Sequence, residues 1–168
     1  MMTRPPDPEI AGDNWFDQWM QRLEEWAPPT SNIWMNHQAR DDYWRHGSIC
    51  ENYDDIECAV YAVGGWEDGY SNAVPRMLAN LSCPRKGLIG PWGHTYPEQG
   101  YPGPAIGFLQ EGLRWWDYWL KNLDTGIMEE DMYRVWMQDY VKPSATLEHV
   151  PGRWINEPIW PSPNVETK

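Results

Sequence analysis

Two apolar runs in the middle of the chain predict two buried strands. The first run, residues 58–63, is continuously apolar; the second, residues 86–90, begins with Lys86 and is otherwise without polar side chains. Polar side chains follow each of them. Between them, apolar side chains recur at helical spacing and predict a helix over residues 72–82. Continuously apolar strands are typical of a sheet that is covered on both faces, and two strands joined by a helix run parallel. The pattern therefore predicts an α/β fold with parallel strands and crossover helices.

The second half of the chain continues this alternation of helix and strand. Residues 95–104 are rich in proline and glycine and predict a loop, whereas residues 105–122 carry the strongest helical pattern of the chain. The apolar side chains of that helix fall on one stripe, made of Ala105, Leu109, Leu113, Trp116 and Leu120. Residues 133–140 alternate in polarity and predict one further strand.

The first part of the chain has a helical pattern without strands. Asp13 is placed to cap a helix whose apolar face carries Trp15, Trp19, Leu23 and Trp26, and Pro28 with Pro29 ends it. Ser31 is placed to cap a second helix over about residues 32–45. These patterns predict a helical hairpin ahead of the sheet.

The patterns divide the chain into three parts. Residues 1–47 form the helical segment, residues 48–141 form the α/β part, and residues 142–168 form a linker and the start of a further module. Thirteen Trp and nine Tyr against two Phe are unusual for a chain of 168 residues. Such rings bury a large area and require partners for their polar atoms, which suggests a piece of a larger, aromatic-lined structure.

The charge of the chain argues against nucleic acid as a partner. The formal net charge is −12, which repels a phosphate backbone, although plain solubility is the simpler reason for such a charge. Cys50, Cys58 and Cys83 form no CxxC pair, so they favour free thiols in a reducing compartment and predict no metal site. No run has the length of a signal peptide or a membrane span, and we expect a soluble, cytoplasmic protein without a membrane partner.

Two acid-base residues follow the two predicted strands. Asp68 and His94 each lie just past a strand end, and the carboxyl ends of parallel strands meet at one edge of a sheet. An acid that orients an imidazole, in the order acid and then histidine, is the pattern of the α/β-hydrolase triad. The alternatives are a turn role for Asp68 before Gly69 and a structural role for His94. Glu67 is a rival acid. Because neighbouring side chains point in different directions, only one of Glu67 and Asp68 can face the histidine.

A serine nucleophile is not evident in the sequence. The segment from Gly69 to Ala73 comes closest to a nucleophile elbow, with Ser71 in its centre, but it does not directly follow a strand. Ser71 is better interpreted as a helix cap.

Three segments resemble the CocE/NonD family of serine hydrolases, which includes cocaine esterase and X-Pro dipeptidyl-peptidases. They are Gly64-Gly-Trp-Glu-Asp-Gly-Tyr70, Leu88-Ile-Gly-Pro-Trp-Gly-His94 and Arg114-Trp-Trp-Asp-Tyr-Trp-Leu-Lys121. The resemblance implies that Asp68 is the triad acid, that His94 is the base and that Tyr70 faces the substrate pocket. It also implies a partial α/β-hydrolase fold, a helical hairpin from the cap in residues 1–47, and a jelly-roll domain that begins within residues 142–168.

The resemblance implies a function for this segment as well. It would be the acid- and base-bearing part of a serine hydrolase that cleaves ester or amide bonds, acyl or X-Pro dipeptidyl, through an acyl-serine, with a nucleophile outside this chain. The partner would be a small ester or amide or a peptide, and no cofactor is implied. The chain alone would be inactive. The alternative is a non-catalytic truncated product or an aromatic-rich interaction module; the oligomeric state is not predicted.

Overall fold

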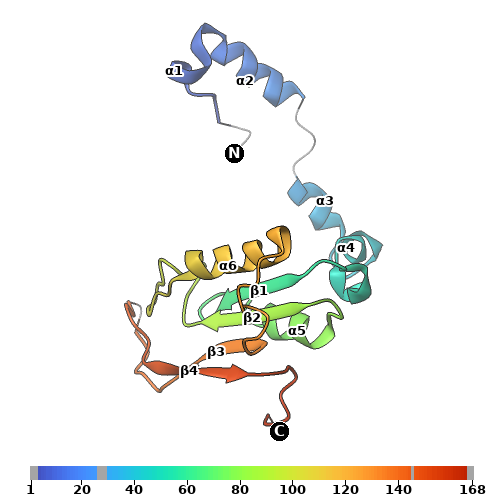
Figure 1. Cartoon of the computed structure of the whole chain (residues 1–168). Coiled ribbons are helices and arrows are strands. Elements are labelled where there is room, and N and C mark those ends of the chain that lie inside the picture. Colours follow the sequence, from blue (N-terminus) through green and yellow to red (C-terminus); the bar gives the residue numbers. More distant parts are fainter. Residues whose placement is uncertain (1–3, 26–29, 145, 166–168) are drawn as a thin grey trace. The chain divides into compact units, whose positions relative to one another are not determined.

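The chain divides into a helical unit and a unit that contains a sheet. A computed structural model describes residues 4–25, 30–144 and 146–165 (Figure 1). The compact units are residues 1–51 and residues 52–168, and each is described here by itself.

The first unit consists of short helices. Their bounds are α1 Pro8–Ala11, α2 Trp15–Glu24, α3 Thr30–Asn36 and α4 Asp42–His46, with 3-10 turns at Gly12–Asn14 and Ile49–Glu51. Asp7 caps α1 through its side chain, whereas Asp13, the expected cap, lies within the first 3-10 turn. Trp26, Pro28 and Pro29, which entered the predicted hairpin, lie outside the described residues.

The predicted second helix over residues 32–45 is in fact divided into α3 and α4. The break between α3 and α4 ends at Asp41. The side chain of Asp41 accepts a hydrogen bond from the backbone N–H of Tyr43 and so caps α4. The same carboxylate lies 2.5 Å from Nδ1 of His37. Ser31 was expected as the cap but lies inside α3, which begins at Thr30. Local side-chain hydrogen bonds therefore override the helical periodicity here.

The second unit is built on a sheet of four described strands. The strands are β1 Val60–Gly65, β2 Arg85–Gly90, β3 Tyr133–Gln138 and β4 Gly152–Glu157, in the order β1-β2-β3-β4. The first three strands are parallel, and β4 is antiparallel to β3. Helix α5 (Ala73–Asn80) joins β1 to β2, and helix α6 (Phe108–Lys121) lies between β2 and β3. The predicted partial α/β fold with crossover helices is confirmed.

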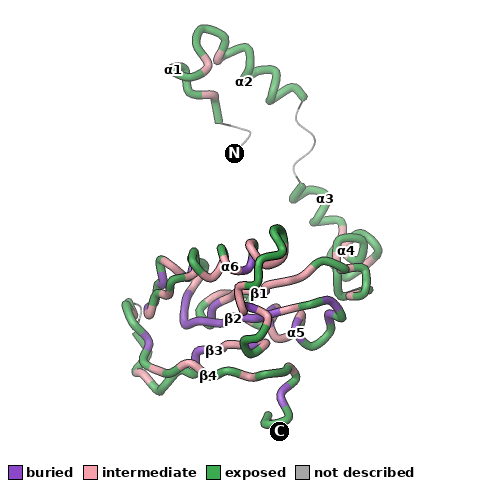
Figure 2. The backbone as a smooth tube through the Cα atoms, in the orientation of Figure 1, coloured by how far each residue is buried: buried purple, intermediate pink, exposed green. Residues whose placement is uncertain are grey.

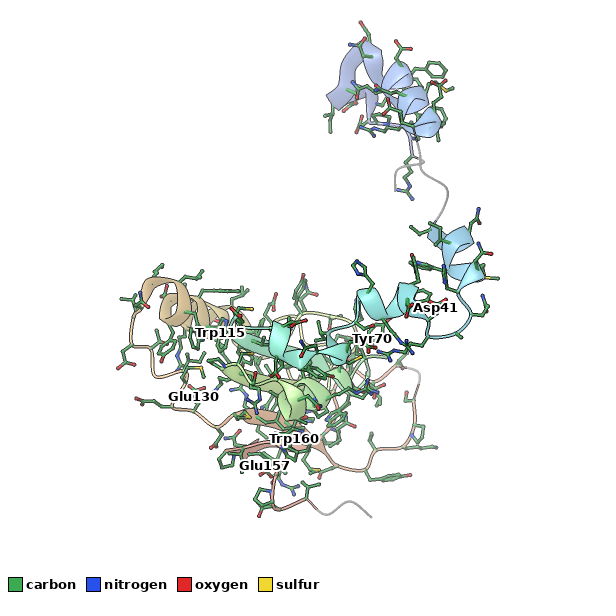
Figure 3. The ribbon with its side chains drawn as sticks, turned by 90° about the vertical axis from the view of Figure 1, so that its right-hand side faces the viewer. Asp41, Tyr70, Trp115, Glu130, Glu157 and Trp160 are labelled. Atoms are coloured by element: carbon green, nitrogen blue, oxygen red, sulfur yellow. The ribbon has the colours of Figure 1, made fainter. Side chains whose placement is uncertain are left out.

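Alternating side chains of the strands place the two helices on opposite faces of the sheet. Ala62 and Ile89 form the core on one face with Val74 and Leu78 of α5. The ring of Tyr61, the neighbour of Ala62, faces α6, and its centroid lies 5.3 Å from that of Trp115. Figure 3 labels Trp115 on α6. Strand β2 is buried from Lys86 to Gly90, between both layers (Figure 2).

The start of β2 contains a buried cation. The Nζ atom of Lys86 donates to the carbonyls of Ile127 and Asp131, at 2.9 and 3.0 Å, and lies 3.4 Å from the carboxylate of Glu130. Burial lowers the pKa of Lys86, and the negative charge of Glu130 opposes this effect. These partners compensate for the loss of water around the ammonium group, so that a lysine is tolerated in a central strand.

Helix α6 does not bury the stripe that its sequence pattern suggested. Trp115 is its buried residue, whereas the stripe residues in the helix are more than half exposed: Leu109, Leu113, Trp116 and Leu120. Beneath the helix, Glu111 accepts hydrogen bonds from the hydroxyl of Tyr61 and the guanidinium of Arg134. The hydrogen bonds of Glu111 with Tyr61 and Arg134, together with the burial of Trp115, determine which face of α6 lies against the sheet.

The strand β4 was not predicted from the sequence, which assigned residues 142–168 to a linker and the start of another module. In the structure, residues 152–157 pair with β3, and the rings of Trp136 and Trp154 meet edge to face at 5.1 Å. A part of that segment therefore completes this sheet. The three-part division and the jelly-roll remain predictions.

Candidate functional site

The segments that follow β1 and β2 are hydrogen-bonded to one another beyond the ends of the strands. The backbone N–H of Trp66 donates to the carbonyl of Gly90 at 2.9 Å, and that of Glu67 donates to the carbonyl of Trp92 at 3.0 Å. Gly65 permits this approach, because a Cβ atom at that position would lie 1.9 Å from the carbonyl oxygen of Trp92. The two polar ends of the strands are therefore held side by side.

The loop that carries His94 is anchored on Trp92. Only 1% of Trp92 is exposed, and its indole N–H donates to the carbonyl of Pro104 at 2.8 Å. The N–H of Gly93 donates to the carbonyl of Tyr101 at 2.9 Å. Side-chain packing and backbone hydrogen bonds thus fix the residues directly before His94.

This arrangement brings Asp68 and His94 into contact. The distance from Nδ1 of His94 to Oδ2 of Asp68 is 2.7 Å, and the backbone N–H of Tyr70 donates to Oδ1 of Asp68 at 2.9 Å. The Asp68 side chain is 15% exposed, and the His94 side chain is 88% exposed. The carboxylate is therefore enclosed while the imidazole is accessible.

The electrostatics of the pair favour an ionised acid. The hydrogen bond from Tyr70 and then the contact with His94 lower the pKa of Asp68 below its usual range. A carboxylate at neutral pH accepts from Nδ1–H of a neutral imidazole. Because Nδ1 carries the proton in that tautomer, Nε2 of His94 has a free lone pair and can take a proton from another group.

Two hollows meet at His94. The larger, about 400 Å³, contains Asp68 and His94 and is lined by Val63, Gly64, Gly65, Trp92, Gly93, Thr95, Tyr96, Pro97 and Phe108. The smaller, about 270 Å³, contains His94 and is lined by Glu67, Gly93, Thr95, Tyr101, Pro102, Ser144 and Leu147. Tyr96, Phe108 and Tyr101 were not predicted from the sequence as neighbours of Asp68 and His94. No sequence motif marks these residues, because Tyr96 and Tyr101 lie in a Pro- and Gly-rich loop and Phe108 lies at the start of α6.

The other residues considered from the sequence take different positions. Glu67 lines the smaller hollow, but Asp68 is the carboxylate that contacts the imidazole. Tyr70 is 75% exposed, and its backbone N–H donates to the carboxylate of Asp68. Ser71 was expected as a helix cap, whereas the residue before α5 is Asn72. Across the described parts of the chain, no serine hydroxyl forms a hydrogen bond with His94.

Within the described ranges, no three His, Cys, Asp or Glu side chains gather in a way that could hold a metal ion. In the same ranges, no helix is long and apolar enough to cross a membrane.

Solved structures with a similar fold include two of a CocE/NonD family hydrolase from Staphylococcus aureus. One is 14% identical, with a TM-score of 0.62, and the match covers 96% of this chain and 27% of that one. The other is 12% identical, with a TM-score of 0.61, and the match covers 90% of this chain and 26% of that one. The chain thus spans about a quarter of the length of these structures, and at this identity the likeness concerns the fold. No curated protein matches the chain.

The sequence itself matches a family model. Residues 2–96 match the model for X-Pro dipeptidyl-peptidase (S15 family), and this range is more than half of the chain and includes Asp68 and His94. The chain therefore belongs to the X-Pro dipeptidyl-peptidase (S15) family, a family of hydrolases.

Proposed function

We propose that Asp68 and His94 are the acid and base of a serine hydrolase that cleaves ester or amide bonds. The observation that carries the proposal is the 2.7 Å contact between Nδ1 of His94 and Oδ2 of Asp68, with the rest of the imidazole open to two hollows. Family membership supports hydrolysis as the reaction class. Small esters, acyl amides and X-Pro peptides are the candidate substrates.

The proposed mechanism gives each residue one task. Nε2 of His94 takes the proton of a serine hydroxyl as the oxygen attacks the carbonyl carbon, and it then returns that proton to the leaving group. Asp68 holds the productive tautomer and stabilises the imidazolium that forms. Water then releases the acyl group from the serine with the same base. No step requires a metal or an organic cofactor.

The serine that His94 serves is, in this proposal, not one of the serines of this chain. Ser71 donates its backbone N–H to the carbonyl of Asp68. Ser144 lines the smaller hollow, but its hydroxyl oxygen accepts from the N–H of Thr146. Two predictions from the sequence remain untested. One is that Tyr70 contacts the substrate, and the other is a cytoplasmic location.

An activity-based probe tests the location of the nucleophile. The isolated chain should not hydrolyse short acyl esters above background and should not react with a fluorophosphonate, because a base and an acid without a nucleophile have nothing to activate. Intact-mass spectrometry measures the labelling, with Ser71→Ala and Ser144→Ala as matched variants. Stoichiometric labelling that one of these variants removes would place the nucleophile within this chain and overturn this part of the proposal.

The alternative, an aromatic-rich interaction module, has one observation in its favour. Leu109, Leu113 and Trp116 of α6 form an exposed apolar stripe. A protein that only binds through this face would not depend on the Asp68–His94 contact, and substitution of either residue would leave its function unchanged.

A further inference from the structure

A third hollow lies at the carboxyl end of α6 and shares no lining residue with the two hollows at His94. Its volume is about 460 Å³. It is lined by Tyr118, Trp119, Asn122, Leu123, Asp124, Gly126, Met128 and Glu129. All of these residues belong to the second unit, so the hollow is complete within residues 52–168.

Two aromatic rings form one side of this hollow. Tyr118 and Trp119 meet edge to face, with ring centroids 5.1 Å apart. The faces of such rings, of tryptophan above all, attract cations. The indole nitrogen of Trp119 is buried and has no hydrogen-bond partner among the described residues. Both aromatic side chains line the hollow, and a cation bound there would lie beside them.

The charged groups that line the hollow are all acidic. Glu129 is exposed, and within the described residues its carboxylate forms no hydrogen bond or ion pair. One carboxylate oxygen of Asp124 accepts a hydrogen bond from the N–H of Gly126 at 3.1 Å. The two nearest cations in the sequence have other partners. Lys121 lies 2.7 Å from Asp117, and Arg114 lies 2.6 Å from Glu130. The negative charge of the hollow is therefore not neutralised by the protein.

The end of α6 adds to this negative potential. The helix has 14 residues and ends at Lys121, and Asn122 follows in the left-handed conformation, with φ 55°. The carboxyl end of a helix carries a partial negative charge that favours a cation nearby. The aromatic side chains, the carboxylates and the helix end thus favour the same kind of ligand, a cation.

We propose that this hollow binds an organic ammonium ion whose alkyl groups pack against Trp119, Leu123 and Met128 and whose charge faces Glu129. An alkylated ammonium fits better than a metal ion, because aromatic and thioether side chains make up much of the lining and metal ions such as Mg²⁺ or Ca²⁺ require several oxygen ligands. The site lies outside the Asp68–His94 pair and does not depend on the proposed catalytic function.

Choline is the probe for this proposal, and 3,3-dimethyl-1-butanol is its uncharged counterpart of nearly the same shape. Titration of the full chain, followed by ¹H–¹⁵N spectra, should give saturable shifts at residues 122–129 with choline. The dissociation constant should be roughly millimolar, as for a shallow site with one or two cation–π contacts. The uncharged alcohol should give no saturable shift, and the amide of His94 should not move.

Two variants and two controls distinguish the site from general attraction to an acidic protein. Trp119→Leu should weaken choline binding about tenfold, and Glu129→Gln should weaken it about threefold. Glu9→Gln removes the same charge in the first unit, and Trp116→Leu removes an indole from the exposed stripe of α6; both should bind like the unchanged chain. Glu129 is exposed, so the Gln variant should fold even if the Trp119 variant does not.

Three results would contradict the proposal. They are an absence of saturable shifts at tens of millimolar choline, equal binding of the uncharged alcohol, and unchanged affinity of the Glu129→Gln variant. The second would show an apolar hollow without preference for a cation. The last would show that the charge of the whole chain, rather than this site, attracts choline.

Discussion

A hydrolase that contains this segment together with its serine nucleophile is expected to lose acylation when His94 is replaced by Ala. Without the imidazole, the serine hydroxyl of the proposed mechanism has no base, and removal of such a base lowers kcat by about 10⁶-fold in the serine protease subtilisin. Single-turnover measurement of the acyl-serine separates this step from later ones. KM should change little, because His94 supplies little ground-state binding. A His94→Ala enzyme that acylates at nearly the original rate would exclude His94 as the base.

Replacement of Asp68 by Asn in the same enzyme is expected to lower turnover by about 10⁴-fold while the fold is kept. The amide can donate to Nδ1, which favours the tautomer with the proton on Nε2, and that tautomer cannot accept the serine proton. Steady-state kinetics on purified variants measures the effect. The hydrogen bond from Tyr70 to Oδ1 can form with the amide oxygen as well, so the local backbone should remain in place.

Glu67→Gln is the matched control for the acid. Glu67 is the neighbouring carboxylate, but the imidazole contacts Asp68. The control should therefore lower turnover far less than Asp68→Asn. If Glu67→Gln lowered turnover strongly and Asp68→Asn did not, Glu67 would be the acid. If both variants kept nearly full turnover, Asp68 would be a structural turn residue.

The sheet edge that carries the candidate site could be predicted because its determinants are local. Residues 58–63 are an apolar run, and residues 86–90 are apolar apart from Lys86 at their start. The bounds of β1 and β2 lie within two residues of these segments. Once the strands are parallel neighbours, their carboxyl ends meet, and the residues just beyond them are close. The choice between Glu67 and Asp68 depended on the turn after β1, which the sequence pattern did not define.

Other features depended on partners distant in the sequence. Strand β4 mixes polar and apolar residues, and its Trp154 packs against Trp136 of β3 and against Trp92, both distant in the sequence. Helix α6 carries apolar residues around much of its circumference. The face turned to the sheet was decided by Trp115 and by the pairing of Glu111 with Arg134, which its periodicity could not reveal.

The tautomer of His94 in this chain decides whether the imidazole can act as the base. Long-range ¹H–¹⁵N correlation at about pH 8.5, two units above the usual imidazole pKa, shows which nitrogen of a neutral histidine carries the proton. His94→Ala assigns the signal, and His37, whose Nδ1 contacts Asp41, is an internal comparison. The proposed mechanism requires the Nδ1–H tautomer of His94, and Asp68→Asn should shift it toward Nε2–H. An Nε2–H tautomer in the unchanged chain would contradict it, because that imidazole could not take a proton from serine.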